Sequence, residues 1–230
     1  TLTVARQVDS IISPSSHQAA RLAEAGLGPI TVIPNTMAAP IDAAVLERIG
    51  RPLRLLWIGR FVPEKRILPF IRAACTALDA LPPNALEIDI VGEGEQFSKA
   101  QRLAAGHPQI NLHGRVQHSR VQDMLAQSHL SVLTSVGWDN QPMVIVESIN
   151  GLRGVIVCDP ALTEGLDGPG IPAFGTDEET LARVMIDLAT NTDKVVEASK
   201  ACLSAREEFS VETYVARTLG VYADALASKA

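Results

Sequence analysis

The sequence predicts an α/β protein built on a Rossmann-like parallel sheet with helices on both faces. Short, continuously apolar runs rich in β-branched residues alternate with helical stretches of ten to eighteen residues, the pattern of a sheet that is buried on both sides. The chain has 230 residues, 47% of them hydrophobic, which is enough for a well-buried core. The expected strands of the main sheet are 53–58, 86–91, 110–113, 130–134 and 154–158.

The composition excludes several classes of protein. The formal net charge is −6, which argues against a nucleic-acid-binding protein, since such proteins carry a basic face. The cysteines Cys75, Cys158 and Cys202 form no CxxC pair, so we expect reduced thiols, no zinc site and a cytoplasmic protein. No apolar run approaches the roughly 18 residues of a membrane-spanning helix, and no signal peptide is visible. The chain starts at Thr1 without a methionine, so we expect it to be part of a longer protein.

The first 50 residues predict a small strand–helix–strand segment and a linker. "DSIIS" (9–13) is typical of a strand, and a helix follows from Ser15 or Ser16 to Ala25, closed by Gly26. "ITVIP" (30–34) predicts a second strand. We expect the rest, up to residue 50, to combine a turn with one short helix.

The loop after the strand 53–58 concentrates charge. In "GRFVPEKRIL" (59–68), Arg60 and Lys65 precede a helix that we expect to begin at Pro69, whose missing N–H costs nothing at the first helical position. Free N–H groups and the helix dipole favour anions there, so the two cations predict a diphosphate site. The alternative is a solvated charged loop in which Glu64 forms a salt bridge.

"VGEGEQF" (91–97) follows the next strand and partly matches the dinucleotide fingerprint G-x-G-x-x-G. The third glycine is replaced by Phe97, and Glu93 and Glu95 would repel a pyrophosphate on this turn. Nicotinamide chemistry is therefore disfavoured. We expect Gly92 to allow a tight turn and the close approach of a ligand.

"GWDNQPMVIVES" (137–148) carries the most information. It follows the strand 130–134, and we expect Pro142 to be the first residue of its helix. Asp139 or Asn140 could cap that helix, and for Asp139 alone a simple cap is the favoured interpretation.

Glu147 lies inside the same helix, among apolar residues. A buried carboxylate there needs partners. Sugar or ribose hydroxyls would provide donors, and a salt bridge to Arg115 or Arg153 is the alternative.

The C-terminal stretch 210–227 predicts one long helix with Ser210 as a plausible N-cap. Apolar residues recur every three or four positions and form one stripe. The stripe must pack on this domain or on a neighbour. Its members are Val211, Val215, Leu219, Tyr222 and Leu226.

In this order and spacing, "IGRFVPEKR", "VGEG", "LHGRV" and "DNQPMVIVES" resemble the donor-binding half of retaining, nucleotide-sugar-dependent glycosyltransferases of the GT-B fold, glycosyltransferase family 4. The resemblance covers nearly the whole chain. It implies that residues 1–35 close the acceptor-side domain and that 36–50 form the linker. It further implies that 51–208 bind the nucleotide sugar and that 209–230 form a helix that packs back toward the acceptor side.

The resemblance also implies roles for single residues. Arg60 and Lys65 would neutralise the donor diphosphate and stabilise the leaving nucleotide, and Gly59 would let the backbone approach. Glu147 would hold the ribose hydroxyls. Asp139, where the family usually has Glu, would hold the hydroxyls of the donor sugar.

Backbone groups complete the implied site. Met143 and Val144 would offer N–H groups near the phosphates, and Gly114 and Val116 would lie where the base is contacted. No metal or resident cofactor is implied. The substrate would be a sugar carried on UDP or GDP, and the acceptor a glycan or a lipid-linked molecule.

Departures from the family pattern keep other functions open. "SINGLRG" follows where the family usually reads A-M-A-x-G-x-P, and no histidine matches the catalytic-side histidine expected in the missing acceptor half. The resemblance implies a hexosyltransferase, and without the acceptor half we expect the chain alone to be inactive. One alternative is a nucleotide-sugar-binding module or subunit without activity of its own, and another is a sugar epimerase of similar architecture. Peripheral contact with a membrane also stays open.

Overall fold

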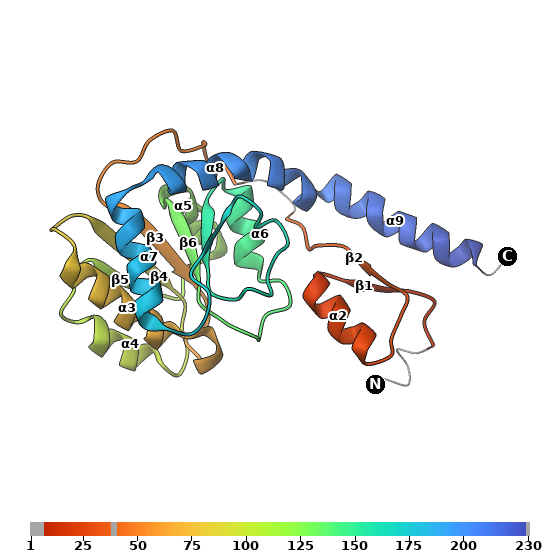
Figure 1. Cartoon of the computed structure of the whole chain (residues 1–230), viewed down its shortest axis with the longest axis horizontal. Coiled ribbons are helices and arrows are strands. Elements are labelled where there is room, and N and C mark those ends of the chain that lie inside the picture. Colours follow the sequence, from red (N-terminus) through yellow and green to blue (C-terminus); the bar gives the residue numbers. More distant parts are fainter. Residues whose placement is uncertain (1–6, 38–40, 229–230) are drawn as a thin grey trace.

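The structure is a computed structural model that describes residues 7–37 and 41–228. Its centre is a six-stranded sheet in which every pair of neighbouring strands is parallel (Figure 1). Within this sheet, the strand that comes first in the sequence lies in the middle. The next two lie on one side of it, and the last three lie on the other. This is the Rossmann strand order, and the predicted fold class is confirmed. In spatial order the strands are β5 (Ile110–Gly114), β4 (Leu86–Val91), β3 (Leu53–Ile58), β6 (Leu130–Leu133), β7 (Gly154–Val157) and β8 (Gly170–Pro172).

Helices cover both faces of this sheet. In β3 the side chains of Leu55 and Trp57 enter one core cluster and Leu56 enters another, because successive strand residues point to opposite faces. The first face packs against α3 (Ile67–Ala80), α4 (Phe97–Ala104) and α7 (Glu178–Thr190). The other face packs against α5 (His118–Gln127) and α6 (Met143–Asn150). Helix α8 (Asp193–Ala205) contributes to clusters on both sides.

The strands predicted for the main sheet are found to within one residue, and one further strand lies at its edge. Strand β5 is one residue longer than predicted, and β6 and β7 are one residue shorter. Strand β8 was not expected from the sequence. Its three residues include Gly170 and Pro172, which argue against a strand in the middle of a sheet but are tolerated at an edge.

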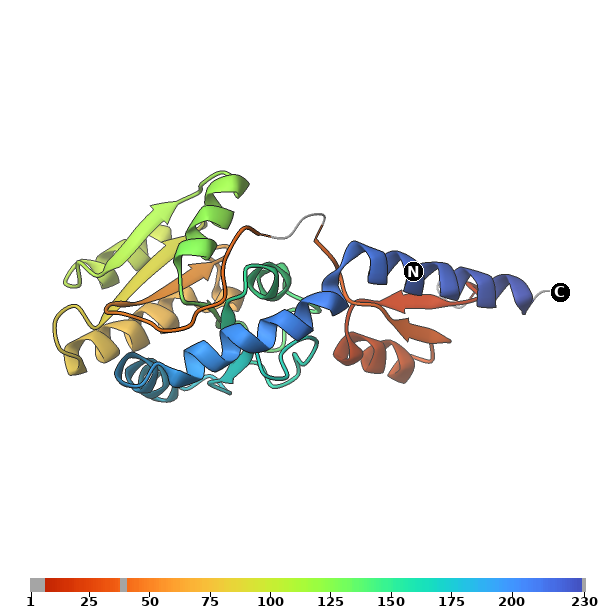
Figure 2. The ribbon, with the colours of Figure 1, turned by 90° about the horizontal axis from the view of Figure 1, so that it is seen from above.

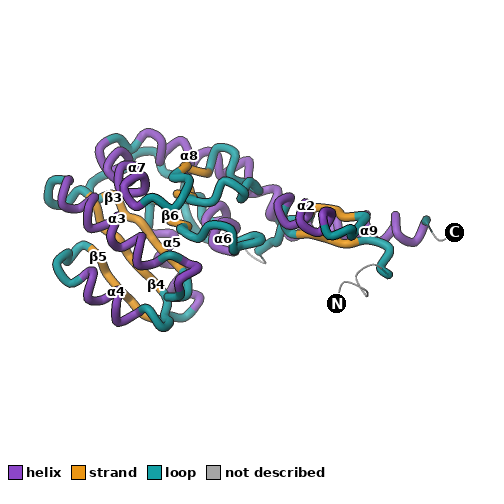
Figure 3. The backbone as a smooth tube through the Cα atoms, turned by 60° about the horizontal axis from the view of Figure 1, so that its bottom comes forward, coloured by secondary structure: helices purple, strands orange, loops and turns teal. Residues whose placement is uncertain are grey.

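The N-terminal segment forms a separate two-stranded parallel sheet, set apart from the main sheet in Figures 2 and 3. It consists of β1 (Ile11–Ser13), α2 (Ser16–Glu24) and β2 (Ile30–Val32). Ser15 caps α2 by accepting a hydrogen bond from the Gln18 N–H at 3.2 Å.

The linker contains no helix over residues 41–50, so the expected short helix is not found there. The reason is that tertiary contacts hold this stretch in an irregular path. The Leu46 N–H donates to Ser199 Oγ at 2.9 Å, and the Ala44 carbonyl accepts from the Arg153 guanidinium at 2.9 Å. These bonds compete with the hydrogen bonds that a helix would need.

The chain ends with η2 (Arg206–Phe209) and α9 (Val211–Ala227). Ser210 caps α9 as expected, accepting from the Thr213 N–H at 3.1 Å. No residue of α9 is buried, and the apolar stripe is exposed along its length. Figures 1 and 2 both place α9 alongside the β1–α2–β2 segment. Within 7–37 and 41–228, no helix is both long and apolar enough to cross a membrane.

Candidate functional site

A cleft of about 450 Å³ opens at the carboxyl ends of β3 and β6. These strands are neighbours, but the chain continues from β3 to one side of the sheet and from β6 to the other. The loops that follow them therefore diverge, and ligands bind at this point in open α/β sheets. The cleft is lined by Trp57, Ile58, Gly59, Arg60, Lys65, Leu133, Thr134, Ser135, Asp139, Gln141, Pro142, Met143, Val144 and Glu147.

The cleft brings together seven of the ten residues that the sequence analysis placed at the site. The loop after β3 contributes Gly59, Arg60 and Lys65, and the stretch after β6 contributes Asp139 together with the first residues of α6. Gly92, Gly114 and Val116 do not line it. The residues on the β6 side of the cleft are Asp139, Met143, Val144 and Glu147.

Lys65 and Asp139 are the central charged pair of the cleft. Lys65 ends η1 (Pro63–Lys65), a short 3₁₀ helix between β3 and α3. Its ammonium forms an ion pair with one carboxylate oxygen of Asp139, and the Ser135 hydroxyl donates to the other. The side chains of Lys65 and Asp139 are only 21% and 15% exposed, so solvent screens this pair less than a surface pair.

Two predicted helix starts differ in detail. Helix α3 begins at Ile67, so Pro69 is its third residue, still within the turn whose N–H groups need no intrahelical partner. Pro142 is the N-cap of α6 rather than its first residue, and no side chain caps this helix. The simple cap favoured for Asp139 is therefore wrong, because its carboxylate is bound to Lys65 and Ser135.

Arg60 is the more solvated of the two predicted diphosphate-binding cations. Its guanidinium lies 3.5 Å from the Glu64 carboxylate, and its side chain is 71% exposed. The alternative of a loop salt bridge thus holds for Arg60 and Glu64 but not for Lys65. Such an exposed pair contributes little to stability, so Arg60 can reorient toward a ligand at small cost.

The Glu147 carboxylate forms no hydrogen bond or ion pair with the residues that the structure describes. The two expected partners are engaged elsewhere. Arg115 pairs with Glu93 at 3.3 Å, and Arg153 donates to carbonyl groups, including Ser128 O at 2.7 Å. Burial raises the pKa of the Glu147 carboxyl. A carboxylate that lacks protein donors in a cleft is suited to accept hydrogen bonds from hydroxyl groups of a ligand.

Gly92 lies where two loops of the main sheet come into close contact. Its φ is +137°, and a Cβ atom built there would lie 1.8 Å from the Gly59 carbonyl oxygen. The loops after β3 and β4 therefore approach each other closely at Gly92. Val116 packs against a core cluster. Gly114 lines a separate hollow of about 470 Å³ next to Phe97.

Sequence reasoning missed three polar residues of the cleft, Thr134, Ser135 and Gln141. They could have been identified from the sequence, because they directly follow a buried strand or precede the helix start at Pro142. Gln141 Oε1 accepts a 2.6 Å hydrogen bond from the Asn35 N–H, which joins the cleft to the end of the N-terminal segment.

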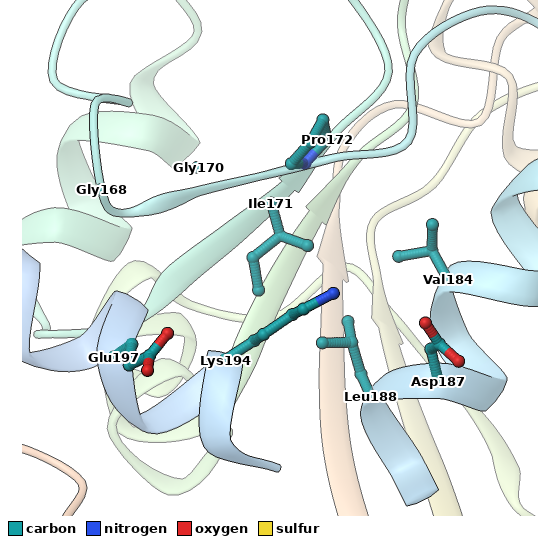
Figure 4. A pocket seen from close by; sticks show the side chains of 9 residues that line it. All are labelled: Gly168, Gly170, Ile171, Pro172, Val184, Asp187, Leu188, Lys194 and Glu197. Atoms are coloured by element: carbon teal, nitrogen blue, oxygen red, sulfur yellow. The ribbon is translucent and has the colours of Figure 1, made fainter. Parts of the chain in front are cut away.

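Another hollow, of about 360 Å³, lies between β8, α7 and α8 (Figure 4). Lys194 extends between Ile171 and Leu188, and Asp187 lies beside them. It contains none of the predicted site residues. Within the described part of the chain, no group of three or more His, Cys, Asp and Glu side chains could hold a metal ion.

Comparison with known proteins gives one family. The model of the family described as "Glycosyl transferases group 1" matches residues 52–191, more than half of the chain. No curated protein matches the sequence.

Solved structures share the fold. A mutant of S. aureus TarM in complex with fondaparinux, α-GlcNAc-glycerol and UDP is 20% identical, with a TM-score of 0.78 over 95% of this chain. The pneumococcal O-GlcNAc transferase GtfA in complex with UDP and GlcNAc is 22% identical, with a TM-score of 0.74 over 97%. Anabaena HepE in complex with UDP and glucose is 19% identical, with a TM-score of 0.74 over 95%. The chain covers only 44%, 46% and 65% of these three proteins.

Proposed function

The chain belongs to the group 1 glycosyltransferase family, and from this premise we propose that it is the donor-binding part of a retaining hexosyltransferase. Its substrate is a sugar carried on a nucleoside diphosphate, UDP or GDP. The observation that carries the proposal is the meeting of Lys65, Asp139 and Glu147 in one cleft at the switch point of the sheet. Such a cleft offers a cation for phosphate and two carboxylates for hydroxyl groups.

Each group has a role in this proposal. Lys65, with Arg60, binds the diphosphate and stabilises its charge as the glycosidic bond breaks. The N–H groups of Met143 and Val144, in the first turn of α6, have no intrahelical acceptor and favour the same anion. Glu147 accepts hydrogen bonds from the ribose hydroxyls.

The proposed reaction needs neither a metal ion nor a resident cofactor. In this account the positive charge that a metal would place at the diphosphate is provided by Arg60, Lys65 and the first turn of α6. Asp139 holds the donor sugar through its hydroxyl groups. Its side chain is one methylene shorter than the Glu that is usual in the family, and we propose that this difference affects the choice of sugar.

The acceptor site belongs to the other half of the enzyme in this proposal. The chain covers less than half of TarM and GtfA, which supports an acceptor-binding domain outside these 230 residues. That domain takes a glycan or a lipid-linked acceptor, and the chain alone transfers no sugar. We also propose a cytoplasmic location, with peripheral membrane contact where the acceptor is a lipid. Free thiols at Cys75, Cys158 and Cys202 support a reducing compartment.

The proposal is tested by following UDP-glucose and GDP-mannose by NMR in the presence of the chain. We expect saturation transfer from the protein to one of the two nucleotide sugars, with no transfer product and no change of sugar configuration. Accumulation of an epimer without release of nucleotide would instead identify an epimerase. Absence of contact with either donor would contradict the proposed site.

A further inference from the structure

Lys65 needs support from outside its own segment. It ends η1, a 3₁₀ helix of only three residues, and such short helices have little stability of their own. Within the loop, the Lys65 N–H donates to the Val62 carbonyl at 3.1 Å. The Lys65 carbonyl accepts a 2.7 Å hydrogen bond from Thr134 Oγ1, at the end of the neighbouring strand β6.

The direction of this bond is determined by a third residue. Trp57 Nε1 lies 3.0 Å from the same Thr134 hydroxyl. An indole N–H can only donate, so the hydroxyl accepts from Trp57 and its proton points to the Lys65 carbonyl. Trp57 is 2% exposed and Thr134 is 1% exposed. Loss of the hydroxyl would leave the buried Trp57 N–H without its partner and would remove the bond to the part-buried Lys65 carbonyl.

Arg66 adds a second tie from the next position in the chain. Its φ is +56°, in the left-handed region that a non-glycine residue rarely adopts. Its guanidinium donates to the carbonyl oxygens of Thr134 at 3.2 Å, Gly175 at 3.3 Å and Thr176 at 2.6 Å. Thr134 thus contacts the β3 loop twice. Its hydroxyl binds the Lys65 carbonyl, and its own carbonyl accepts from the Arg66 guanidinium.

We propose that Thr134 and Arg66 are positioning residues that hold Lys65 at the switch point for binding of the donor diphosphate. They act through Lys65, since the Thr134 hydroxyl is committed to Trp57 and Lys65, and the Arg66 guanidinium to carbonyl groups. The inference rests on the proposed function. The position of the Lys65 ammonium then depends on the bonds of Thr134 and Arg66 between the β3 loop and β6. Loss of these bonds should weaken the binding of nucleoside diphosphates more than that of monophosphates.

The test compares diphosphate with monophosphate binding by calorimetry, with UDP against UMP and GDP against GMP. Thr134→Val removes the hydroxyl at nearly constant shape, and Thr134→Ser is the matched control that keeps it. We expect Thr134→Val to weaken the diphosphate about fivefold or more while monophosphate affinity changes less than about twofold. Thr134→Ser should retain the diphosphate affinity.

Arg66→Gly is the second variant, because glycine suits the φ of +56° and only the guanidinium contacts are lost. It should show the same selective loss, which keeps the test available if Thr134→Val does not fold by circular dichroism. Equal loss of diphosphate and monophosphate, or no loss in either variant, would overturn the positioning role. If the unsubstituted chain binds neither UDP nor GDP, the proposed function itself fails, and the positioning role fails with it.

Discussion

Lys65 and Asp139, 74 positions apart in the sequence, form an ion pair across the mouth of the switch point between β3 and β6. One partner comes from the loop after each strand. A diphosphate bound at Lys65 would therefore compete with the Asp139 carboxylate for the same ammonium. Both groups are implied in donor binding, so phosphate binding and release of Asp139 toward the sugar are expected to be coupled.

Asp139→Asn should strengthen the binding of a free nucleoside diphosphate, because the substitution removes a competing anion next to Lys65. A gain of about threefold to fivefold corresponds to up to ~1 kcal/mol, the upper end for a partly exposed ion pair. Calorimetry with UDP and GDP measures it. Asp187→Asn, in the remote hollow beside β8, is the control and should change nothing. Weaker diphosphate binding by Asp139→Asn would refute the competition.

Glu147→Gln should raise the unfolding temperature at pH 7. Burial raises the pKa of the Glu147 carboxyl, so the folded protein holds this proton more tightly than the unfolded chain. The ionised group therefore lowers the free energy of unfolding once the pH is above its folded pKa. The gain should disappear below about pH 4.5, the ordinary value, where the carboxyl is protonated in both states. Thermal scans from pH 4 to pH 8 test this, and a pH-independent difference would contradict it.

The same variant tests the ribose role of Glu147. If its carboxylate accepts hydrogen bonds from both ribose hydroxyls, Glu147→Gln should bind the ribonucleotide about tenfold more weakly, as expected for the loss of charge-assisted bonds. The preference for UDP over 2′-deoxy-UDP should shrink at the same time. Titrations with both nucleotides measure this preference, and an unchanged ratio would mean that Glu147 does not contact the 2′-hydroxyl.

Gly92→Ala should destabilise the fold by about 3 kcal/mol or more, in the range of strained backbone and steric overlap. The added Cβ atom would lie 1.8 Å from the Gly59 carbonyl oxygen, at a φ of +137°. Because Gly59 begins the loop that carries Lys65, nucleotide binding should weaken as well. Gly106→Ala is the matched control, since a Cβ atom there meets nothing within 4 Å. Denaturant unfolding of both variants gives the comparison, and equal stability would be evidence against the close packing of the two loops.

The main sheet could be predicted because its strands are continuous apolar runs, such as Leu53–Ile58. Strand β8 could not, since its pairing with β7 rather than its composition makes Gly170–Pro172 a strand. The short helix predicted in the linker is absent over residues 41–50 for a related reason. Bonds from Arg153 and Ser199, more than 100 positions away, determine its path.

Features of the site likewise divide into those that could be predicted from the sequence and those that could not. Lys65 and Asp139 could be predicted to share a cleft because each follows a strand end. The pairing between them and the support from Thr134 could not be predicted, because these depend on side-chain packing across β3 and β6. The packing of Gly92 against the Gly59 carbonyl could not be predicted either, because the sequence does not identify the group that approaches a glycine.

Calorimetric titration of the chain and of Lys65→Ala with UDP, GDP and ADP, with and without magnesium, tests whether Lys65 belongs to a diphosphate site. We expect binding of one diphosphate, indifferent to magnesium, weakened at least about tenfold in Lys65→Ala and unchanged in the control Lys194→Ala. Equal affinity of Lys65→Ala and the unsubstituted chain, or no binding of any diphosphate, would contradict a diphosphate site at Lys65.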